Sequence, residues 1–144
     1  MSEEMYGYDK DYLFAVKAMK DGDLEKAIAL LLSILKDNPH DGKSLFLLGG
    51  CYEITNEPIR ALLSLKEGHK IDPAYHNYAF LSSLGRAYKN LYLYDFALDF
   101  FNKALELGKK EESIYRDLAV IYLQKDNMDK AIEIILEGIN FNES

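Results

Sequence analysis

Tryptophan is absent from this sequence of 144 residues, and cysteine occurs once, at Cys51. A single cysteine excludes a disulfide within the chain and fits a reducing compartment. Because free cysteine is among the most frequently buried residue types, we expect Cys51 to be a small buried side chain rather than a reactive thiol.

The sequence also lacks a long hydrophobic run. Its longest apolar stretch, residues 27–32, is far shorter than the ~20 residues that span a bilayer. The first residues are acidic and mixed, without the basic stretch and apolar core of a secretory leader. At 49% hydrophobic residues, the chain has enough apolar side chains for one packed domain. We therefore expect a cytoplasmic protein that is not secreted and has no membrane segment.

Clusters of basic residues are missing as well, and the formal net charge is −7. The acidic excess lies in the two end regions: residues 1–41 hold nine acidic and five basic side chains, and residues 112–144 hold seven and three. Binding to a phosphate backbone needs a patch of lysine and arginine. The charge pattern therefore argues against a nucleic-acid partner.

Catalytic and metal-binding patterns are equally absent from the sequence. His40, His69 and His76 do not form a pair with the spacing of metal ligands. There is no glycine-rich phosphate loop and no nucleophile motif. We expect a protein that is not an enzyme and needs no metal or cofactor.

A helical pattern that recurs four times is what the sequence does contain. In its clearest unit, apolar and small residues at i, i+3, i+4 and i+7 define one helical face, and a second face follows after a turn. The two faces consist of Leu45, Leu48, Gly49 and Tyr52, and of Ala61, Leu65 and Gly68. Between them, Asn56 is suited to end one helix and Pro58 to begin the next.

This pattern resembles the tetratricopeptide repeat, whose period is about 34 residues. The matching units are residues 8–41, 42–75, 78–111 and 112–144. Two departures stand out: Ala18 replaces the tyrosine of the other units, and only Pro39 and Pro73 match the terminal proline of the family. The resemblance implies an all-α fold, a right-handed α-solenoid of four antiparallel helix-turn-helix repeats. It also implies one domain over residues 1–144 that binds proteins as a scaffold or adaptor.

Within these units we expect an N-terminal arm and then eight helices. Their ranges are 9–20, 24–36, 42–54, 58–71, 74–90, 94–107, 112–125 and 128–140. Asp23 and Asn127 have side chains that cap helix starts, and Gly108 suits the left-handed position after a helix end. Residues 76–77 lengthen the third unit, either as a longer loop or as a backward extension of its first helix. Pro73 favours the extension.

Gly49 and Gly85 occupy the same position in two repeats. Because glycine inside a helix costs about 1 kcal/mol relative to alanine, both positions predict a close approach of the paired helix. We expect Ala61 and Ala97 to supply the small surface opposite these glycines.

The resemblance further implies a concave groove lined by the first helices of successive repeats. The candidates for apolar contact with a bound peptide are Tyr12, Val16, Phe46 and Ile54. The candidates for contact by charge are Arg86, Lys89 and Arg116.

Groove positions hold five basic and two acidic side chains, in contrast to the net charge of the whole chain. A positive groove would attract an acidic peptide or a C-terminal carboxylate. The alternative is that these residues are ordinary solvated side chains on amphipathic helices. The clamp of lysines, asparagines and arginine with which some family members hold chaperone tails is not matched. Counted from the first repeat, its places are taken by Tyr12, Val16, Leu47, Ala79 and Ser83. Counted from the second, they are taken by Phe46, Gly50, Ser83, Ser113 and Asp117.

The last predicted helix carries more apolar residues than one buried face can hold. They are Ile132, Ile134, Ile135, Leu136, Ile139 and Phe141. We expect some of them to be exposed, which predicts a homodimer with twofold symmetry through this C-terminal helix. The alternative is that the chain is an excised part of a longer array.

Overall fold

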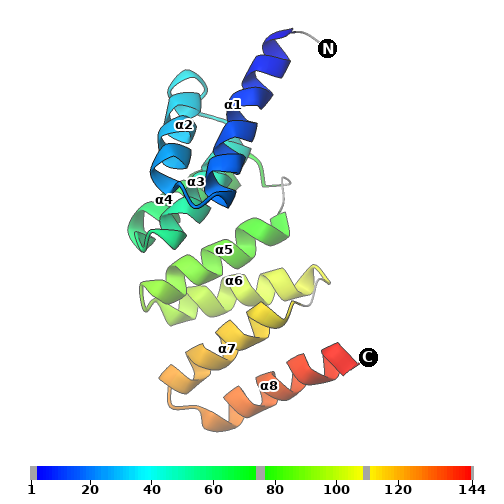
Figure 1. The fold of residues 1–144 in the computed structure, drawn as a ribbon. Coiled ribbons are helices and arrows are strands. Elements are labelled where there is room, and N and C mark those ends of the chain that lie inside the picture. The colour runs from blue at the N-terminus through cyan, green and yellow to red at the C-terminus, as the bar shows by residue number, and fades with distance from the viewer. Residues whose placement is uncertain (1–2, 74–76, 109–110, 144) are drawn as a thin grey trace. The chain divides into compact units, whose positions relative to one another are not determined.

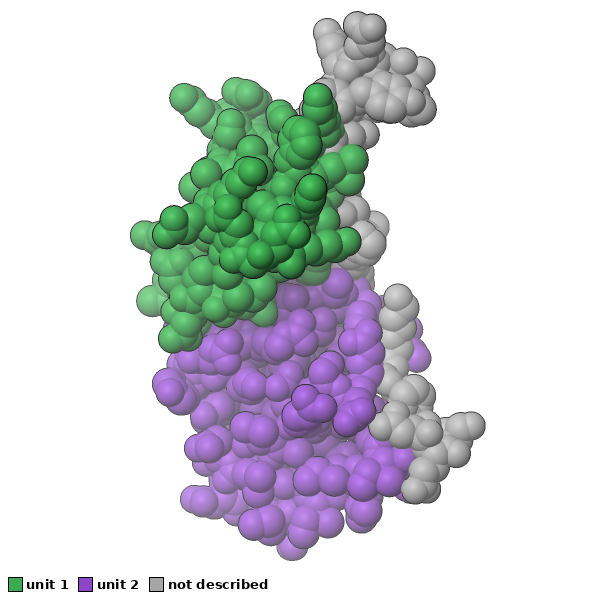
Figure 2. Space-filling model, in the orientation of Figure 1, with its two compact units in different colours: residues 1–77 green, residues 78–144 purple. Residues whose placement is uncertain are grey.

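The computed structural model describes residues 3–73, 77–108 and 111–143, and over these residues the chain forms eight α-helices and no β-strand. The helices belong to two compact units, residues 1–77 and 78–144, coloured separately in Figure 2. Unit 1 contains α1 (Glu3–Lys20), α2 (Leu24–Asp37), α3 (Gly42–Ile54) and α4 (Pro58–Ile71). Unit 2 contains α5 (Asn77–Asn90), α6 (Tyr94–Glu106), α7 (Glu112–Gln124) and α8 (Met128–Glu143). Consecutive helices pair into antiparallel hairpins within each unit (Figure 1).

The helix bounds agree best with prediction in the second repeat, where α3 and α4 begin and end at the predicted residues. The predicted N-terminal arm is wrong, because α1 begins at Glu3 instead of Asp9. Glutamate is a good helix former, which favours a helix that begins this early in the chain.

The first helix of the third repeat was predicted to extend backward from residue 74. Residues 74–76 lie outside the described residues, and α5 is described from Asn77. Pro73 itself lies in a turn that follows the end of α4.

The turn inside each repeat uses one residue with a left-handed backbone at a single repeat position. These residues are Gly22 (φ 82°), Asn56 (φ 59°), Tyr92 (φ 63°) and Asp126 (φ 57°). The expected capping residues follow these turns: the side chain of Asp23 accepts a hydrogen bond from the amide of Lys26 at 3.2 Å. Asn127 does the same for Lys130 at 3.1 Å. Gly108 has the predicted positive φ, 87°.

The predicted close approach at the two helical glycines is confirmed, with different partners. A Cβ placed on Gly49 would lie 2.6 Å from Cγ of Leu65, and one on Gly85 would lie 2.7 Å from Cδ1 of Phe101. The closest atoms therefore belong to large side chains one turn beyond the expected Ala61 and Ala97. Glycine leaves the space into which these large side chains pack.

The core of unit 1 forms where α3 packs against the first hairpin. Leu48 and Cys51 of α3 meet Ala15 of α1 and Leu31 and Ile34 of α2. Cys51 is fully buried, as predicted, and burial raises the pKa of its thiol. In unit 2, Tyr88 of α5 stacks on the Phe96 and Phe100 rings of α6, with centroids 5.3 and 5.4 Å away.

Candidate functional site

The four apolar candidate residues all lie in unit 1. Tyr12 and Val16 on α1 and Phe46 on α3 are half-buried, and Ile54 at the end of α3 is exposed. The Lys43 ammonium lies 4.9 Å from the centre of the Tyr12 ring, close enough for a cation–π contact. Unit 1 therefore offers an aromatic and aliphatic surface that already carries one positive charge.

Met19 of α1 lies against Gly50 of α3. A Cβ at Gly50 would lie 3.5 Å from the terminal methyl group of Met19, an ordinary van der Waals distance. Methionine is flexible and polarizable, so this methyl group can adapt to a bound side chain.

The three basic candidate residues lie in unit 2, with Arg86 and Lys89 on α5 and Arg116 on α7. Lys89 forms an ion pair with Asp117, Nζ to Oδ1 at 2.6 Å, and the two side chains are only 21% and 13% exposed. Arg86 donates a hydrogen bond to the Ser83 hydroxyl at 3.3 Å. The ion pair places the Lys89 charge against α7 and away from solvent.

Arg116 is also paired, with Glu112 one turn earlier on α7, at 3.3 Å between Nη2 and Oε1. Both side chains are largely exposed, so this pair is weak and can open to receive a ligand. The number of charges at the predicted groove positions did not include the carboxylates of Glu112 and Asp117, which lie at other positions of the repeat. The local positive charge of unit 2 is therefore smaller than the sequence count indicates.

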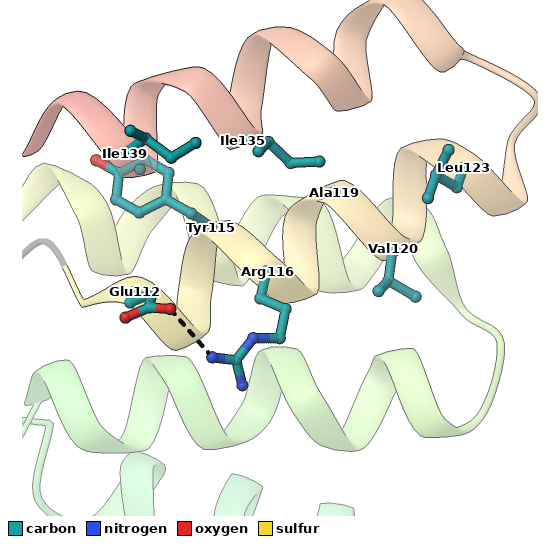
Figure 3. A pocket seen from close by; sticks show the side chains of 9 residues that line it. Glu112, Tyr115, Arg116, Ala119, Val120, Leu123, Ile135 and Ile139 are labelled. Carbon is teal, nitrogen blue, oxygen red and sulfur yellow. Dashed lines mark hydrogen bonds and ion pairs between the residues drawn. The ribbon is translucent and has the colours of Figure 1, made fainter. Parts of the chain in front are cut away.

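A groove with a volume of about 290 Å³ opens between α7 and α8. Figure 3 shows it from close by, with Arg116 and Glu112 joined at its edge. Its lining consists of Glu112, Tyr115, Arg116, Ala119, Val120, Leu123, Ile135, Gly138 and Ile139. A Cβ on Gly138 would lie 3.0 Å from Cβ of Tyr115, so glycine permits the close contact of the two helices here. We call this surface the end groove.

The walls of the end groove are apolar and accessible. Val120, Leu123, Ile135 and Ile139 are all exposed, and Ile132 and Leu136 extend the exposed stripe along α8. Tyr115 is buried at the base of the groove, and this burial, together with the nearby Glu137 carboxylate, raises the pKa of its phenol. The exposed apolar excess of α8 was predicted. On the α7 side Arg116 was predicted as a groove residue, but a groove shared by α7 and α8 was not, because the helix crossing decides which α7 residues face α8.

Within the described residues, no group of three or more histidine, cysteine, aspartate or glutamate side chains is arranged to hold a metal ion. Of the three histidines, His40 is exposed, His69 is half-buried and His76 lies outside the described residues. No described helix combines the length and the apolar character that crossing a membrane requires.

The comparison with protein families matches residues 112–144 to the family model described as tetratricopeptide repeat. No curated protein sequence matches the chain. Among solved structures, one of MamA is 17% identical with a TM-score of 0.85, covering 94% of this chain and 78% of that one. Another, MamA AMB-1, is 26% identical with a TM-score of 0.79, covering 92% of this chain and 77% of that one.

A chain of the APC/C hetero-tetramer Cut9-Hcn1 is 22% identical with a TM-score of 0.83, covering 90% of this chain and 26% of that one. These likenesses, together with the hairpins described above, confirm the predicted fold class, an all-α solenoid type built from antiparallel helix-turn-helix repeats.

Proposed function

This chain carries tetratricopeptide repeats, and from that premise we propose that residues 1–144 act as one protein-binding domain, a non-enzymatic scaffold or adaptor of the cytoplasm. Proteins with this fold generally bind other proteins, and the buried Cys51 fits a reducing compartment. The same pattern of small and apolar residues recurs in all four repeats without a linker between them. This continuity supports one domain rather than two.

The proposed ligand is a peptide segment of a partner, bound on the surface formed by the first helices of the repeats. Tyr12, Val16, Phe46 and Ile54 would contact its apolar side chains. The observation that carries this proposal is the accessible apolar surface on α1 and α3, which Lys43 flanks at the Tyr12 ring. An acidic segment or a C-terminal carboxylate would pair with Arg86 and with Arg116, the latter after its exposed pair with Glu112 opens. Lys89, which Asp117 holds in a mostly buried pair, would add only to the local positive potential.

The test is binding to an immobilised array of peptides that differ in charge and in their C-terminal carboxylate. We expect acidic peptides to be selected, and the combined Arg86→Ala and Arg116→Ala variant to lose about tenfold or more in affinity. Ile54→Ser removes an exposed apolar contact and should weaken the same peptides. Lys89 is left intact, because its pair with Asp117 contributes to folding.

The chain supplies matched controls for both variants. Arg60→Ala removes the remaining arginine, which lies on α4, and Ile59→Ser changes an isoleucine of α4 that is 64% exposed. Neither should affect binding. Affinity that stays constant between low and high salt would refute the role of charge, because exposed ion pairs are screened at physiological ionic strength.

A second candidate function is self-association through α8, as an assembly subunit. The observation that favours it is the exposed apolar stripe of α8, which continues onto α7 at Val120 and Leu123. Sedimentation equilibrium of the 144-residue chain should give twice the monomer mass at high protein concentration. A monomer at every concentration would refute this function and leave peptide binding untouched.

A further inference from the structure

The residues that line the end groove have counterparts at the same positions of the first repeat, and there the next helix of the chain packs against them. Counting from the first residue of each unit, its lining includes positions 5, 8 and 12 of the first helix and positions 24, 27 and 28 of the second. In the first repeat these are Tyr12, Ala15, Met19, Leu31, Ile34 and Leu35. They pack in one cluster with Leu47, Leu48 and Cys51 of α3. In unit 1 the first helix of the next repeat thus buries Ala15, Leu31 and Ile34, while Tyr12 at the rim stays half-exposed.

Burial at equivalent positions shows what the fourth repeat leaves uncovered. Leu31 in α2 and Phe101 in α6 are fully buried, whereas Ile135 in α8 is 44% exposed. In unit 1 α3 packs against α2, and in unit 2 α7 packs against α6. No described helix covers the corresponding surface of α7 and α8, so it is a helix-binding groove without an occupant among the described residues.

The helices that fill such grooves define the chemistry of the missing occupant. At positions 3, 7 and 10 of their repeats both helices have buried residues: Ser44, Leu48 and Cys51 on α3, and Ile114, Leu118 and Ile121 on α7. Both sets have the spacing i, i+4, i+7, and their side chains are small or aliphatic. The occupant is therefore a helix with an apolar stripe of that spacing.

A second copy of α1 does not have this chemistry. At the same three positions it carries Lys10, Phe14 and Lys17. Both lysines are exposed on α1, and their counterparts in α3 and α7 are buried. Burying two ammonium groups in an apolar groove is costly unless each is paired. End-to-end stacking, which would place α1 of one copy in the end groove of another and generate an open filament, is therefore disfavoured.

The α8 helix does carry the required stripe. Ile132, Leu136 and Ile139 have the spacing i, i+4, i+7 and are 48%, 53% and 46% exposed. Among the described helices, no other has three exposed large apolar side chains at this spacing. Ile139 belongs both to the stripe and to the lining of the end groove, so the inserting and receiving surfaces are continuous.

We propose that α8 of a second copy of this chain occupies the end groove, in a symmetric dimer in which each α8 lies in the groove of its partner. This inference rests on the second proposed function, self-association, and specifies its geometry. Each copy carries a net charge of −7, so added salt should strengthen the dimer by screening the mutual repulsion. That is the reverse of the salt effect expected for an acidic peptide.

The first test compares substitutions by sedimentation velocity across a concentration series. Ile139→Glu should weaken the dimer about tenfold or more, because it puts a charge into the apolar contact. Ile59→Glu is the matched control on α4, where the original side chain is even more exposed, and it should leave the dimer intact. Phe14→Glu should also leave it intact, because α1 takes no part.

The second test is a disulfide between identical residues, which only a symmetric contact allows. Leu136→Cys should form a covalent dimer on mild oxidation, whereas Leu32→Cys, at the same repeat position on α2 and 48% exposed, should not. The native Cys51 is buried and supplies no background.

The results distinguish self-association itself from the specific placement of α8 in the end groove of the partner. A wild-type chain that stays monomeric overturns self-association and the inference together. A dimer that Phe14→Glu disrupts, and in which Leu136→Cys forms no disulfide, supports self-association and overturns the α8 geometry.

Discussion

Two adjacent glycines of α3 show how strongly the surroundings decide the role of a residue. A Cβ on Gly49 would lie 2.6 Å from Cγ of Leu65, a fully buried side chain that would have to shift. A Cβ on Gly50 would meet only the Met19 methyl group, at 3.5 Å. The first glycine is therefore required for packing, and the second is not.

This difference predicts opposite effects for the same substitution. Gly49→Ala gains about 1 kcal/mol of helix propensity but overpacks the helix crossing by roughly 1 to 3 kcal/mol, so it should destabilise the protein by about 1 kcal/mol. Gly50→Ala should stabilise it by about 0.5 to 1 kcal/mol. Urea unfolding followed by circular dichroism measures both. Equal stabilisation by the two variants would show that Leu65 yields without cost.

For single residues, the sequence predicted the backbone conformation correctly where the residue type itself favours that conformation. Asn56 and Gly108 were expected at helix ends, and both have positive φ. Tyr92 has the same left-handed backbone, which costs an L-residue with a bulky side chain about 1 to 2 kcal/mol. Residue type gave no sign of this conformation, because the requirement comes from the repeat position and not from tyrosine.

Among the helices, the pair of Lys89 and Asp117 joins α5 to α7 across 28 positions of sequence. Both side chains are mostly buried, so removing one partner leaves a charge that is poorly hydrated. The pair therefore holds the first helices of the third and fourth repeats together.

Lys89→Met should destabilise the protein by about 1 to 2 kcal/mol. Breaking a fully buried ion pair costs more, but this pair is partly exposed. Lys103→Met is the matched control, because Lys103 and Asp99 form a pair at 2.9 Å with both side chains more than half exposed. It should change stability by less than about 0.5 kcal/mol. Urea unfolding of both variants, and of Lys89→Met combined with Asp117→Leu, measures the coupling. A double variant no more stable than Lys89→Met would contradict a specific pair.

Helix positions followed closely from the sequence because periodicity and turn residues are local signals. The side-chain contacts between different helices could not be predicted in this way. Lys89 was expected to face a ligand, and the structure pairs it with Asp117, a residue at a position that the groove count had not included. Contacts of this kind depend on the angle and register at which two helices cross, which no local pattern encodes.

For the whole molecule, the proposal of one domain over residues 1–144 predicts coupled unfolding. Gly49→Leu should destabilise unit 1 by roughly 1 to 3 kcal/mol through overpacking against Leu65. Because stacked repeats gain stability from their neighbours, amide protection should then fall in α5 to α8 as well as in unit 1. Hydrogen exchange read by mass spectrometry resolves the two units. Protection lost in residues 3–73 alone would indicate two independent domains.

By itself the sequence determined the fold class. Its spacing of small and apolar residues repeats four times, and that spacing predicts pairs of amphipathic helices. The tertiary structure alone decided which surfaces remain available. It paired Lys89 with Asp117, placed Met19 against Gly50, and left the end groove open between α7 and α8. The reason is physical: a helix forms from contacts within a few residues, whereas exposure depends on which other helix covers it.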